Sequence, residues 1–448
     1  MGLGFGTDGV RGPAEEFSEE FVLALGEAAA RTLGSQFVLG RDTRESGARI
    51  ERVLRRGLER GGASVSILGI APTPAVAWVA DRHSICGAVI SASHNLWSDN
   101  GIKFFGPGGR KLTDEVEREL TETLNGILRR GAAIDGQIDG QVDGGHAVSG
   151  IDPATELRDW SAALRSSVRA AFAGLRVVID CAHGAASTIA PEVIAELGAQ
   201  LEVLHAEPDG RNINDACGST HPQALQERVL ASGAQVGLAF DGDADRLLAV
   251  DETGAIVDGD HLLALFAEDL RDRSALRHEL VVVTVMTNLG FRLAMAERGI
   301  EVVETPVGDR HVLEALARTG GSLGGEQSGH IVFADLATTG DGLLSGLQLL
   351  DLMARRGRPL SELAAGAMTQ LPQVLRNVRV VQRRDDLVDL VATEIAHAQE
   401  RLGEHGRILL RPSGTEPLIR VMVEAESVEL AEEVAAILVA AVEQVCAA

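Results

Sequence analysis

The feature that most restricts the fold is a strand–helix–strand pattern that occurs three times along the chain. Each copy opens with a short apolar stretch typical of a buried strand: Phe37–Leu39, Arg176–Ile179 and Leu280–Val285. A helical segment follows each stretch and ends at a glycine, the usual residue for a left-handed helix end: Gly61, Gly198 and Gly299. A β-branched stretch comes next: Ser64–Leu68, Leu201–Leu204 and Ile300–Val303. Alternating strands and helices predict an α/β fold with three similar units.

Each copy continues into a further strand and then into an unusual polar loop. The strands are Gly87–Ile90, Val236–Phe240 and Gly321–Gly324, and the loops are Ser91–Asn95, Asp241–Arg246 and Gly325–His330. Ligands of α/β proteins bind outside the carboxyl ends of the strands. Three equivalent loops therefore predict one shared cleft.

The pattern after residue 370 is that of a small α+β domain. The predicted elements are strands Val378–Val381, Arg407–Leu410 and Leu418–Ala425, a helix over Asp385–Arg401, and a last helix with Ser427 as its N-cap. An Asp/Gly tetrapeptide repeat over Ile134–Gly144 is typical of a turn-rich linker. We expect four domains, at residues 1–150, 151–254, 255–370 and 371–448.

Charge and composition exclude several classes of protein. Among 448 residues, Lys and Arg number 41 and Asp and Glu number 65, so the formal net charge is 41 − 65 = −24. Such a surface repels nucleic acid and anionic membranes, and 45% hydrophobic residues exclude disorder. Four scattered cysteines without a C-x-x-C pair indicate reduced thiols. With no signal peptide or membrane-length apolar run evident, we expect a cytoplasmic protein.

Asp241, Asp243 and Asp245 alternate directly after an apolar strand. Three carboxylates so close favour a bound divalent cation with oxygen ligands. An EF-hand is a partial match, because Glu252 stands at the twelfth position, but Arg246 occupies the sixth position, where glycine is needed. The same pattern is also compatible with a phosphatase that uses Asp241 as nucleophile, or with a solvated acidic turn.

Three further segments carry reactive or anion-binding groups. Ser91–Asn95 offers hydroxyls and the His94 imidazole, with Lys103 as a nearby charge, although by itself the segment is more typical of a hydrogen-bonded turn. Arg411–Pro417, followed by Arg420, has the parts of an anion cradle or of a plain hairpin turn. Gly6–Gly12 lacks the dinucleotide-binding glycine pattern, but its Arg11 could contact a phosphate.

Taken together and in this order, five segments resemble those of the α-D-phosphohexomutase superfamily over essentially the whole chain. The segments are Gly6–Gly12, Ser91–Asn95, Asp241–Arg246, Gly325–His330 and Arg411–Pro417. The resemblance implies four domains around a central cleft: three similar α/β/α mixed-sheet units and a smaller α+β C-terminal domain. Phe5–Gly12, Gln327 and Thr305–Arg310 are most similar to the branch that acts on glucosamine phosphates.

The resemblance also implies roles for individual residues. Ser93 would carry a phosphoryl group and, with Asp241, Asp243 and Asp245, hold one Mg²⁺. Arg11, His94, Lys103 and Arg246 would line the reacting centre, with His94 or Lys103 transferring the proton. The sugar would contact Glu326, Ser328 and His330. The distal phosphate would contact Arg411, Ser413, Gly414, Thr415 and Arg420.

The implied reaction is an isomerisation by phosphoryl transfer. Glucosamine 6-phosphate and glucosamine 1-phosphate would interconvert through glucosamine 1,6-bisphosphate, supplying the precursor of UDP-N-acetylglucosamine for cell-wall synthesis. Other hexose phosphates as substrates, or a non-catalytic sugar-phosphate sensor, are the competing hypotheses. We expect a monomer or homodimer whose partner is a small sugar phosphate, neither a nucleic acid nor a membrane. Leu96 departs from the family, which usually has proline there, and this frees the loop backbone around Ser93.

Overall fold

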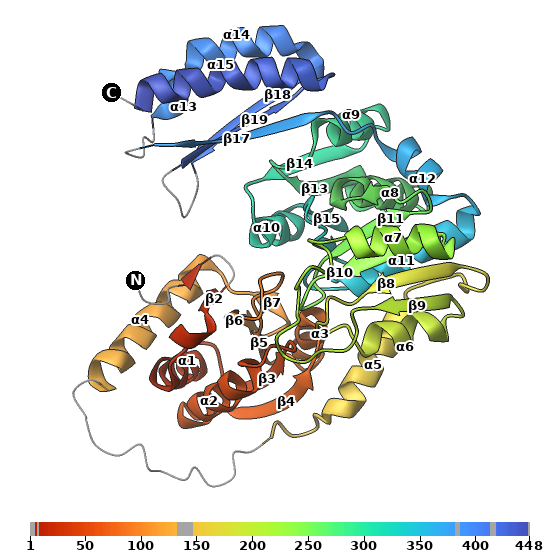
Figure 1. Ribbon diagram of the computed structural model, residues 1–448. Coiled ribbons are helices and arrows are strands. Elements are labelled where there is room, and N and C mark those ends of the chain that lie inside the picture. The colour runs from red at the N-terminus through yellow and green to blue at the C-terminus, as the bar shows by residue number, and fades with distance from the viewer. Residues whose placement is uncertain (1–4, 7–8, 132–146, 381–385, 413–417, 447–448) are drawn as a thin grey trace. The chain divides into compact units, whose positions relative to one another are not determined.

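The computed structural model describes residues 5–6, 9–131, 147–380, 386–412 and 418–446. The chain divides into two compact units. The larger unit comprises Met1–Val285 and Val303–Ala364, and the smaller comprises Met286–Val302 and Ala365–Ala448. Four sheets follow one another along the chain (Figure 1).

The first sheet has the strand order β1-β2-β6-β5-β3-β4, and β7 pairs with β6. Its strands are β1 (Phe5–Gly6), β2 (Gly9–Pro13), β3 (Gln36–Arg41), β4 (Ser64–Ile70), β5 (Cys86–Ile90), β6 (Asp99–Gly106) and β7 (Arg110–Lys111). Its helices are η1 (Ala14–Glu16), α1 (Glu19–Thr32), α2 (Gly47–Arg60), α3 (Thr73–His83) and α4 (Asp114–Gly131). Strands β4, β3 and β5 are parallel, whereas β6 runs antiparallel to β5.

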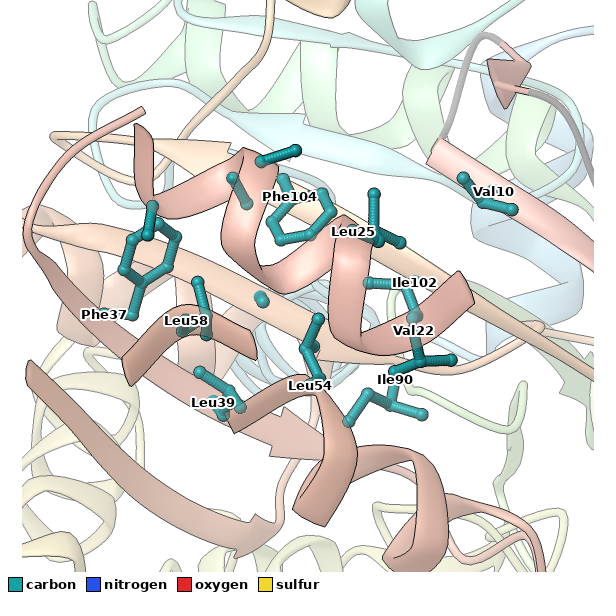
Figure 2. Close-up of a cluster of buried hydrophobic side chains, with 14 of the residues drawn as sticks. Val10, Val22, Leu25, Phe37, Leu39, Leu54, Leu58, Ile90, Ile102 and Phe104 are labelled. Carbon is teal, nitrogen blue, oxygen red and sulfur yellow. The ribbon is translucent and has the colours of Figure 1, made fainter. Parts of the chain in front are cut away.

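Helices cover both faces of this sheet. Successive strand residues point to opposite sides, so an apolar residue at every position needs a packing partner on each face. Phe37 and Leu39 of β3 pack with α1, α2 and α4 in one apolar core, parts of which Figure 2 shows. Val38, between them, packs with α3 in a second core on the other face. The near-continuous apolar run of the strand thus reflects burial on two sides.

The second sheet has the order β12-β11-β10-β8-β9. Its strands are β8 (Arg176–Asp180), β9 (Gln200–Leu204), β10 (Val236–Phe240), β11 (Leu247–Asp251) and β12 (Ile256–Val257). The helices of this part of the chain are α5 (Pro153–Ser166), α6 (Ile189–Glu196), α7 (Gln223–Ser232) and α8 (Gly259–Asp272). Strands β9, β8 and β10 are parallel, and β11 is antiparallel to β10.

The third sheet has the order β14-β13-β15-β16. Its strands are β13 (Leu280–Thr284), β14 (Glu301–Thr305), β15 (Leu323–Gly325) and β16 (Ile331–Phe333). The accompanying helices are η2 (Arg277–Glu279), α9 (Leu289–Glu297), α10 (Asp309–Thr319), α11 (Gly342–Arg356) and α12 (Leu360–Ala367). In all three sheets the first strand of the repeat lies between the second and the third, and an antiparallel fourth strand follows the third. The predicted three similar units are therefore confirmed.

The smaller unit contains a three-stranded antiparallel sheet of order β17-β19-β18. Its strands are β17 (Gln373–Arg379), β18 (Arg407–Pro412) and β19 (Leu418–Glu424). Its helices after residue 380 are α13 (Leu387–Leu390), α14 (Ala392–Leu402), η3 (Gly403–His405) and α15 (Val428–Cys446). Apolar residues of α14 and α15 pack on the sheet in one core, which gives the predicted α+β domain.

Several details differ from the sequence predictions. Gly198 and Gly299 have the predicted left-handed backbone, but after α2 the left-handed residue is Gly62, because Gly61 still closes the last helical turn. Strand β17 begins at Gln373 rather than Val378, since it pairs with β19 along its whole length. The predicted helix Asp385–Arg401 is interrupted at Val391. The predicted linker tract, Ile134–Gly144, lies outside the described residues.

Ser427 accepts a hydrogen bond from the backbone N–H of Leu430, as expected of an N-cap. None of the helices in the described ranges combines the length and the apolar character that a membrane span requires.

Candidate active site

The three unusual loops occupy the same place in the three sheets, directly after the third strand of each repeat. We call them the serine loop (residues 91–98, between β5 and β6), the aspartate loop (241–246, between β10 and β11) and the glutamate loop (326–330, between β15 and β16). The first two meet where the Ser93 hydroxyl donates a hydrogen bond to Asp241 Oδ2 over 2.6 Å. Both side chains are buried.

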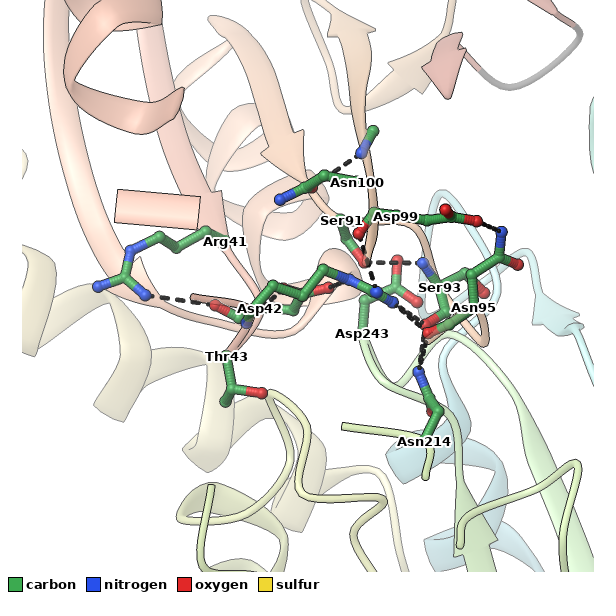
Figure 3. Close-up of polar contacts among 12 residues, drawn as sticks. Arg41, Asp42, Thr43, Ser91, Ser93, Asn95, Asp99, Asn100, Asn214 and Asp243 are labelled. Carbon is green, nitrogen blue, oxygen red and sulfur yellow. Dashed lines mark hydrogen bonds and ion pairs between the residues drawn. The ribbon is translucent and has the colours of Figure 1, made fainter. Parts of the chain in front are cut away.

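Ser93 is held in a backbone conformation that favours glycine, with φ of 52°. Such a conformation persists only where the surroundings fix it, and it is common at functional sites. The Ser93 N–H donates to Ser91 Oγ, and Asn214 Nδ2 donates to the carbonyls of Ser93 and Asn95 (Figure 3). The serine loop is thus a fixed structure, not an ordinary solvent-exposed turn.

The aspartate loop gathers three buried carboxylates. One oxygen each of Asp241, Asp243 and Asp245 lies within 4.8 Å of the others. Asp243 Oδ1 and Asp245 Oδ1 are buried and accept no hydrogen bond from the described residues. Burial, followed by the charges of Asp245 and Asp243, raises the pKa of Asp241 well above its usual range. A divalent cation with oxygen ligands would relieve this repulsion, so the residues fit Mg²⁺.

The solvated-turn interpretation of this loop is wrong, and the EF-hand, which Arg246 at the sixth position already argued against, does not fit the flanking elements either. The carboxylates are buried, so the loop is not a solvated acidic turn. Strands β10 and β11 flank it, whereas an EF-hand loop requires two helices.

Lys103 lies beside the carboxylates on β6. Its Nζ is 3.1 Å from Asp243 Oδ2 and 3.4 Å from Asp245 Oδ2, and its side chain is only 3% exposed. Burial raises the pKa of Asp245, but the charges of Lys103 and His330 outweigh burial and hold it well below the usual range. Lys103 is therefore an ammonium ion paired with carboxylates.

His94 faces the Ser93 hydroxyl from the other side. Its Nδ1 lies 3.4 Å from Ser93 Oγ and 3.3 Å from Arg246 Nη1. Burial, and then the charges of Arg246 and Arg11, lower the pKa of His94 to about 4. The imidazole is therefore neutral near pH 7, and its Nδ1, facing the Arg246 N–H donor, is the hydrogen-bond acceptor.

The glutamate loop brings the third group of predicted residues toward the aspartates. His330 is buried, with Nδ1 3.6 Å from Asp245 Oδ2, and its Nε2 accepts a hydrogen bond from the Gly340 N–H. Burial lowers the pKa of His330, but the Asp245 charge outweighs it and raises the value. Glu326 accepts a hydrogen bond from the Gly308 N–H, and Ser328 is exposed. His330 thus supports Asp245, while Ser328 faces solvent.

Two predicted phosphate ligands lie in the smaller unit, on neighbouring strands. Arg411 of β18 pairs in register with Arg420 of β19. Burial and the neighbouring Arg420 charge lower the pKa of Arg411. Two adjacent guanidinium groups repel one another, and a bound anion would remove that cost. The other predicted ligands, Ser413, Gly414 and Thr415, lie outside the described residues.

Sequence reasoning missed Arg44, Asn214 and Thr73. Arg44 and Asn214 bind backbone carbonyls of the serine loop, and the Thr73 hydroxyl donates to Asp243 Oδ2 over 2.7 Å. Arg44 follows the first strand of its repeat at the carboxyl edge of the sheet, which was a usable signal. Nothing in the local sequence marks Thr73 or Asn214.

Comparison with known proteins identifies the family. Four models of phosphoglucomutase/phosphomannomutase domains match the chain in order. They are alpha/beta/alpha domain I over residues 2–130, domain II over 158–254, domain III over 258–371 and the C-terminal domain over 367–441.

Solved structures of low sequence identity share the fold. A phosphoglucomutase/phosphomannomutase family protein from Burkholderia thailandensis superposes with a TM-score of 0.80 at 23% identity, covering 98% of this chain and 97% of its own. The N-acetylphosphoglucosamine mutase of Aspergillus fumigatus, solved in complex with GlcNAc-6P and magnesium, gives 0.71 at 20% identity, covering 100% and 96%.

Curated relatives are much more similar. The phosphoglucosamine mutase of Carboxydothermus hydrogenoformans is 47% identical over 99% of this chain and 100% of its own length. That of Rubrobacter xylanophilus is 49% identical over 96% and 95%. Because four family domains match in order and full-length relatives share nearly half of its residues, the chain belongs to the phosphoglucomutase/phosphomannomutase family, in its phosphoglucosamine mutase branch.

Proposed function

We propose that the chain interconverts glucosamine 6-phosphate and glucosamine 1-phosphate, as an isomerase that supplies an amino-sugar precursor for cell-wall synthesis. The observation that carries this proposal is the buried Ser93 hydroxyl, which lies between the Asp241 carboxylate and the neutral His94 imidazole. A sensor of sugar phosphates would need neither this hydroxyl nor three buried carboxylates. Because the similar curated proteins are named phosphoglucosamine mutases, we choose glucosamine phosphates rather than mannose or glucose phosphates as the substrates of this chain.

Ser93 acts as the phosphoryl carrier in this proposal. Phosphoserine donates its phosphoryl group to O1 of glucosamine 6-phosphate, which gives glucosamine 1,6-bisphosphate and free Ser93. The bisphosphate then reorients, and its 6-phosphoryl group returns to Ser93, releasing glucosamine 1-phosphate. Phosphoryl transfer depends mainly on positioning and on charge stabilisation, which the buried cations beside Ser93 provide.

The aspartate loop is the proposed metal site. Asp241, Asp243 and Asp245, with an oxygen of phosphorylated Ser93, would hold one Mg²⁺. When bound, the ion neutralises negative charge that develops on the transferring phosphoryl group. Lys103 already contributes one positive charge there.

His94 is the proposed proton acceptor. A sugar hydroxyl that attacks phosphoserine must lose its proton, and the lowered pKa leaves the His94 lone pair available at neutral pH. Lys103, as a charged ammonium between two carboxylates, is better suited to stabilise charge than to accept a proton. Arg246 and Arg11 add positive charge around the phosphoryl group.

The remaining assignments concern binding and organisation. Glu326, Ser328 and His330 would contact the sugar, and the distal phosphate would lie on Arg411 and Arg420 with Ser413, Gly414 and Thr415. We propose domain boundaries at 1–150, 151–254, 255–370 and 371–448; only strand β12 of the second sheet, at Ile256–Val257, falls beyond the end of the domain that holds the rest of its sheet. Cytoplasmic location fits the free cysteines, three of which are buried. Whether the chain is a monomer or homodimer stays a prediction.

Phosphorus NMR of purified protein with Mg²⁺, glucosamine 6-phosphate and a trace of the 1,6-bisphosphate tests the function. We expect a new 1-phosphate signal that Ser93→Ala abolishes and that Ser98→Ala, an exposed serine of the same loop, retains. Conversion of only glucose or mannose phosphates would contradict the choice of sugar. No conversion of any of the three would contradict the proposal that the chain is a mutase.

A further inference from the structure

A second cluster of metal-ligating side chains lies on the loops of the second sheet. It comprises Asp180, His205 and Cys217, whose ligand atoms lie within 4.8 Å of one another. Asp180 ends β8, and His205 directly follows the parallel neighbour β9. Cys217 comes from the connection between β9 and α7. Three separate segments thus bring a carboxylate, an imidazole and a thiol to one point.

Backbone and side-chain hydrogen bonds hold the carboxylate of this cluster in place. Asp180 Oδ1 accepts from the Ala182 N–H over 2.9 Å, and Oδ2 accepts from the Gly218 N–H over 3.0 Å. His205 Nδ1 lies 2.9 Å from Asp180 Oδ2. The ring of His183 packs edge to face on that of His205, with centroids 5.2 Å apart. The carboxylate and the imidazole are therefore held next to each other before any ligand arrives.

The Cys217 side chain is fully buried, and its polar contact is weak. Its Sγ lies 4.0 Å from the Asn212 carbonyl, at the outer limit for a sulfur hydrogen bond. Burial, followed by the charges of Asp180 and Asp215, raises the pKa of Cys217 to about 12. In the metal-free protein this group is a thiol, and the binding of an ion would release its proton to solvent.

We propose that Asp180, His205 and Cys217 form a binding site for a thiophilic divalent ion such as Zn²⁺, separate from the aspartate loop. A mixture of carboxylate, imidazole and thiolate is a donor set that Zn²⁺ accepts, whereas Mg²⁺ prefers oxygen ligands alone. Loss of the Cys217 proton to solvent gives the thiolate. His205 takes the tautomer with its proton on Nε2, so that Nδ1 exchanges its hydrogen bond with Asp180 for a bond to the ion. Water, or His183 after a ring movement, completes a tetrahedral site.

The site is structurally connected to both reactive loops. Asn214, three residues before Cys217, donates to the carbonyls of Ser93 and Asn95. The Ala185 N–H donates to the carbonyl of Gly242 in the aspartate loop over 2.8 Å. At Gly184, an added Cβ would lie only 2.4 Å from that same oxygen, so the two loops are in direct backbone contact. An ion at Asp180 would therefore stiffen the segments that support the serine and aspartate loops.

Cobalt(II) substitution tests the site, because a cobalt–thiolate bond has a near-ultraviolet charge-transfer band that oxygen and nitrogen ligands do not give. The full chain, with Cys446→Ser to remove a partly exposed thiol, is titrated with Co²⁺ in excess Mg²⁺ to occupy the aspartate loop. We expect the band to saturate at one equivalent of Co²⁺. Added Zn²⁺ should displace the Co²⁺ and remove the band. Cys217→Ser should abolish the band, and Cys86→Ser, another buried thiol, should retain it.

Two outcomes would overturn the proposal: no band in the parent protein, or a band that persists in Cys217→Ser. If Cys217→Ser does not fold by circular dichroism, His205→Gln decides the matter, since this ring is 27% exposed and its replacement leaves the thiol in place. It should weaken Co²⁺ binding at least tenfold, and unchanged affinity would contradict the site. Ser93→Ala should keep the band, which separates this test from that of the mutase function.

Discussion

Arg44 Nη2 donates a hydrogen bond to the backbone carbonyl of Ser93 over 2.9 Å. The same guanidinium donates to the carbonyls of Asn95, Leu96 and Asp99, and its Nε donates to Asp42 Oδ2. Arg44 is only 1% exposed. Because its donors form a rigid planar fork, one side chain fixes both ends of the serine loop. Arg44 thus restrains the serine loop at Leu96, where no proline ring fixes the backbone.

Arg44→Lys should lower kcat strongly while changing KM little. A lysine ammonium has three donors and no fork, so buried carbonyls of the serine loop would lose their partners. Each buried unsatisfied group costs about 1–3 kcal/mol, and misplacement of Ser93 should lower kcat roughly 10- to 100-fold. Steady-state kinetics with glucosamine 6-phosphate measures the split between kcat and KM.

Arg49→Lys is the matched control for this variant. Arg49 also donates to backbone carbonyls, those of Phe17 and Ala14, but it does not contact the serine loop among the described residues. The Arg49→Lys variant should lose some thermal stability and keep the kcat of the wild type. Equal kcat losses in the two variants would mean that Arg44 acts only through general stability.

Much of the fold was predictable because the signals were local. The strands of the three repeats, such as Val236–Phe240, could be predicted from their apolar runs and from the glycine that ends each helix. The loops after the third strands were predictable for the same reason, since parallel strands end at one edge of a sheet. Their convergence is visible in the bond between Ser93 and Asp241.

The supporting contacts were not predictable, because they depend on packing between distant segments. Asn214 lies 121 residues from Ser93 along the chain, and Lys103 lies 140 residues from Asp243. Sequence reasoning found Lys103 as a possible proton-transfer group, but only the distances show an ammonium between two carboxylates. The buried position of His330 was also beyond the local pattern.

Asp241→Asn should weaken Mg²⁺ binding and raise the stability of the metal-free protein. Burial and two neighbouring carboxylates raise the pKa of Asp241, so its charged form destabilises the metal-free fold near pH 7. The neutral amide removes that cost but also one ligand. Wild-type protein at Mg²⁺ 100-fold above Kd should gain about 2.7 kcal/mol, and the variant much less.

Thermal unfolding with EDTA and with Mg²⁺ measures both effects. Asp335→Asn, an exposed aspartate paired with Arg277, is the control and should respond to Mg²⁺ like the wild type. An unchanged Mg²⁺ response in Asp241→Asn would contradict the metal assignment.

Asp341 should make stability fall as pH rises from about 4 to 7. Asp341 caps α11 by accepting from the Leu344 N–H, and burial raises its pKa to about 7. Between the unfolded value of 3.8 and this folded value, the folded state binds the additional proton. This group alone therefore costs up to about 1.4 kcal/mol for each pH unit in that window.

Asp341→Asn keeps an N-cap oxygen but removes the titration, so its stability should fall less across this window than that of the wild type. Urea unfolding at several pH values measures the slope. Asp258 caps α8 in the same way; burial raises its pKa, but the hydrogen bond with His261 outweighs burial and lowers it. Asp258→Asn should therefore not reduce the fall in stability across this pH window. Equal slopes for wild type and Asp341→Asn would exclude the proposed protonation.

Arg420→Gln should raise KM for glucosamine 6-phosphate with little loss of thermal stability. Arg420 stands opposite Arg411 across β18 and β19, and two adjacent cations repel one another when no anion is bound. Removing one relieves that repulsion but takes away a charge-assisted hydrogen bond to phosphate, worth about 1.5–3 kcal/mol. KM should rise roughly 10- to 100-fold. Arg376→Gln, an exposed arginine of β17 that pairs with Glu432, is the control and should leave KM unchanged. If Arg420→Gln also leaves KM unchanged, the phosphate does not bind on this pair of strands.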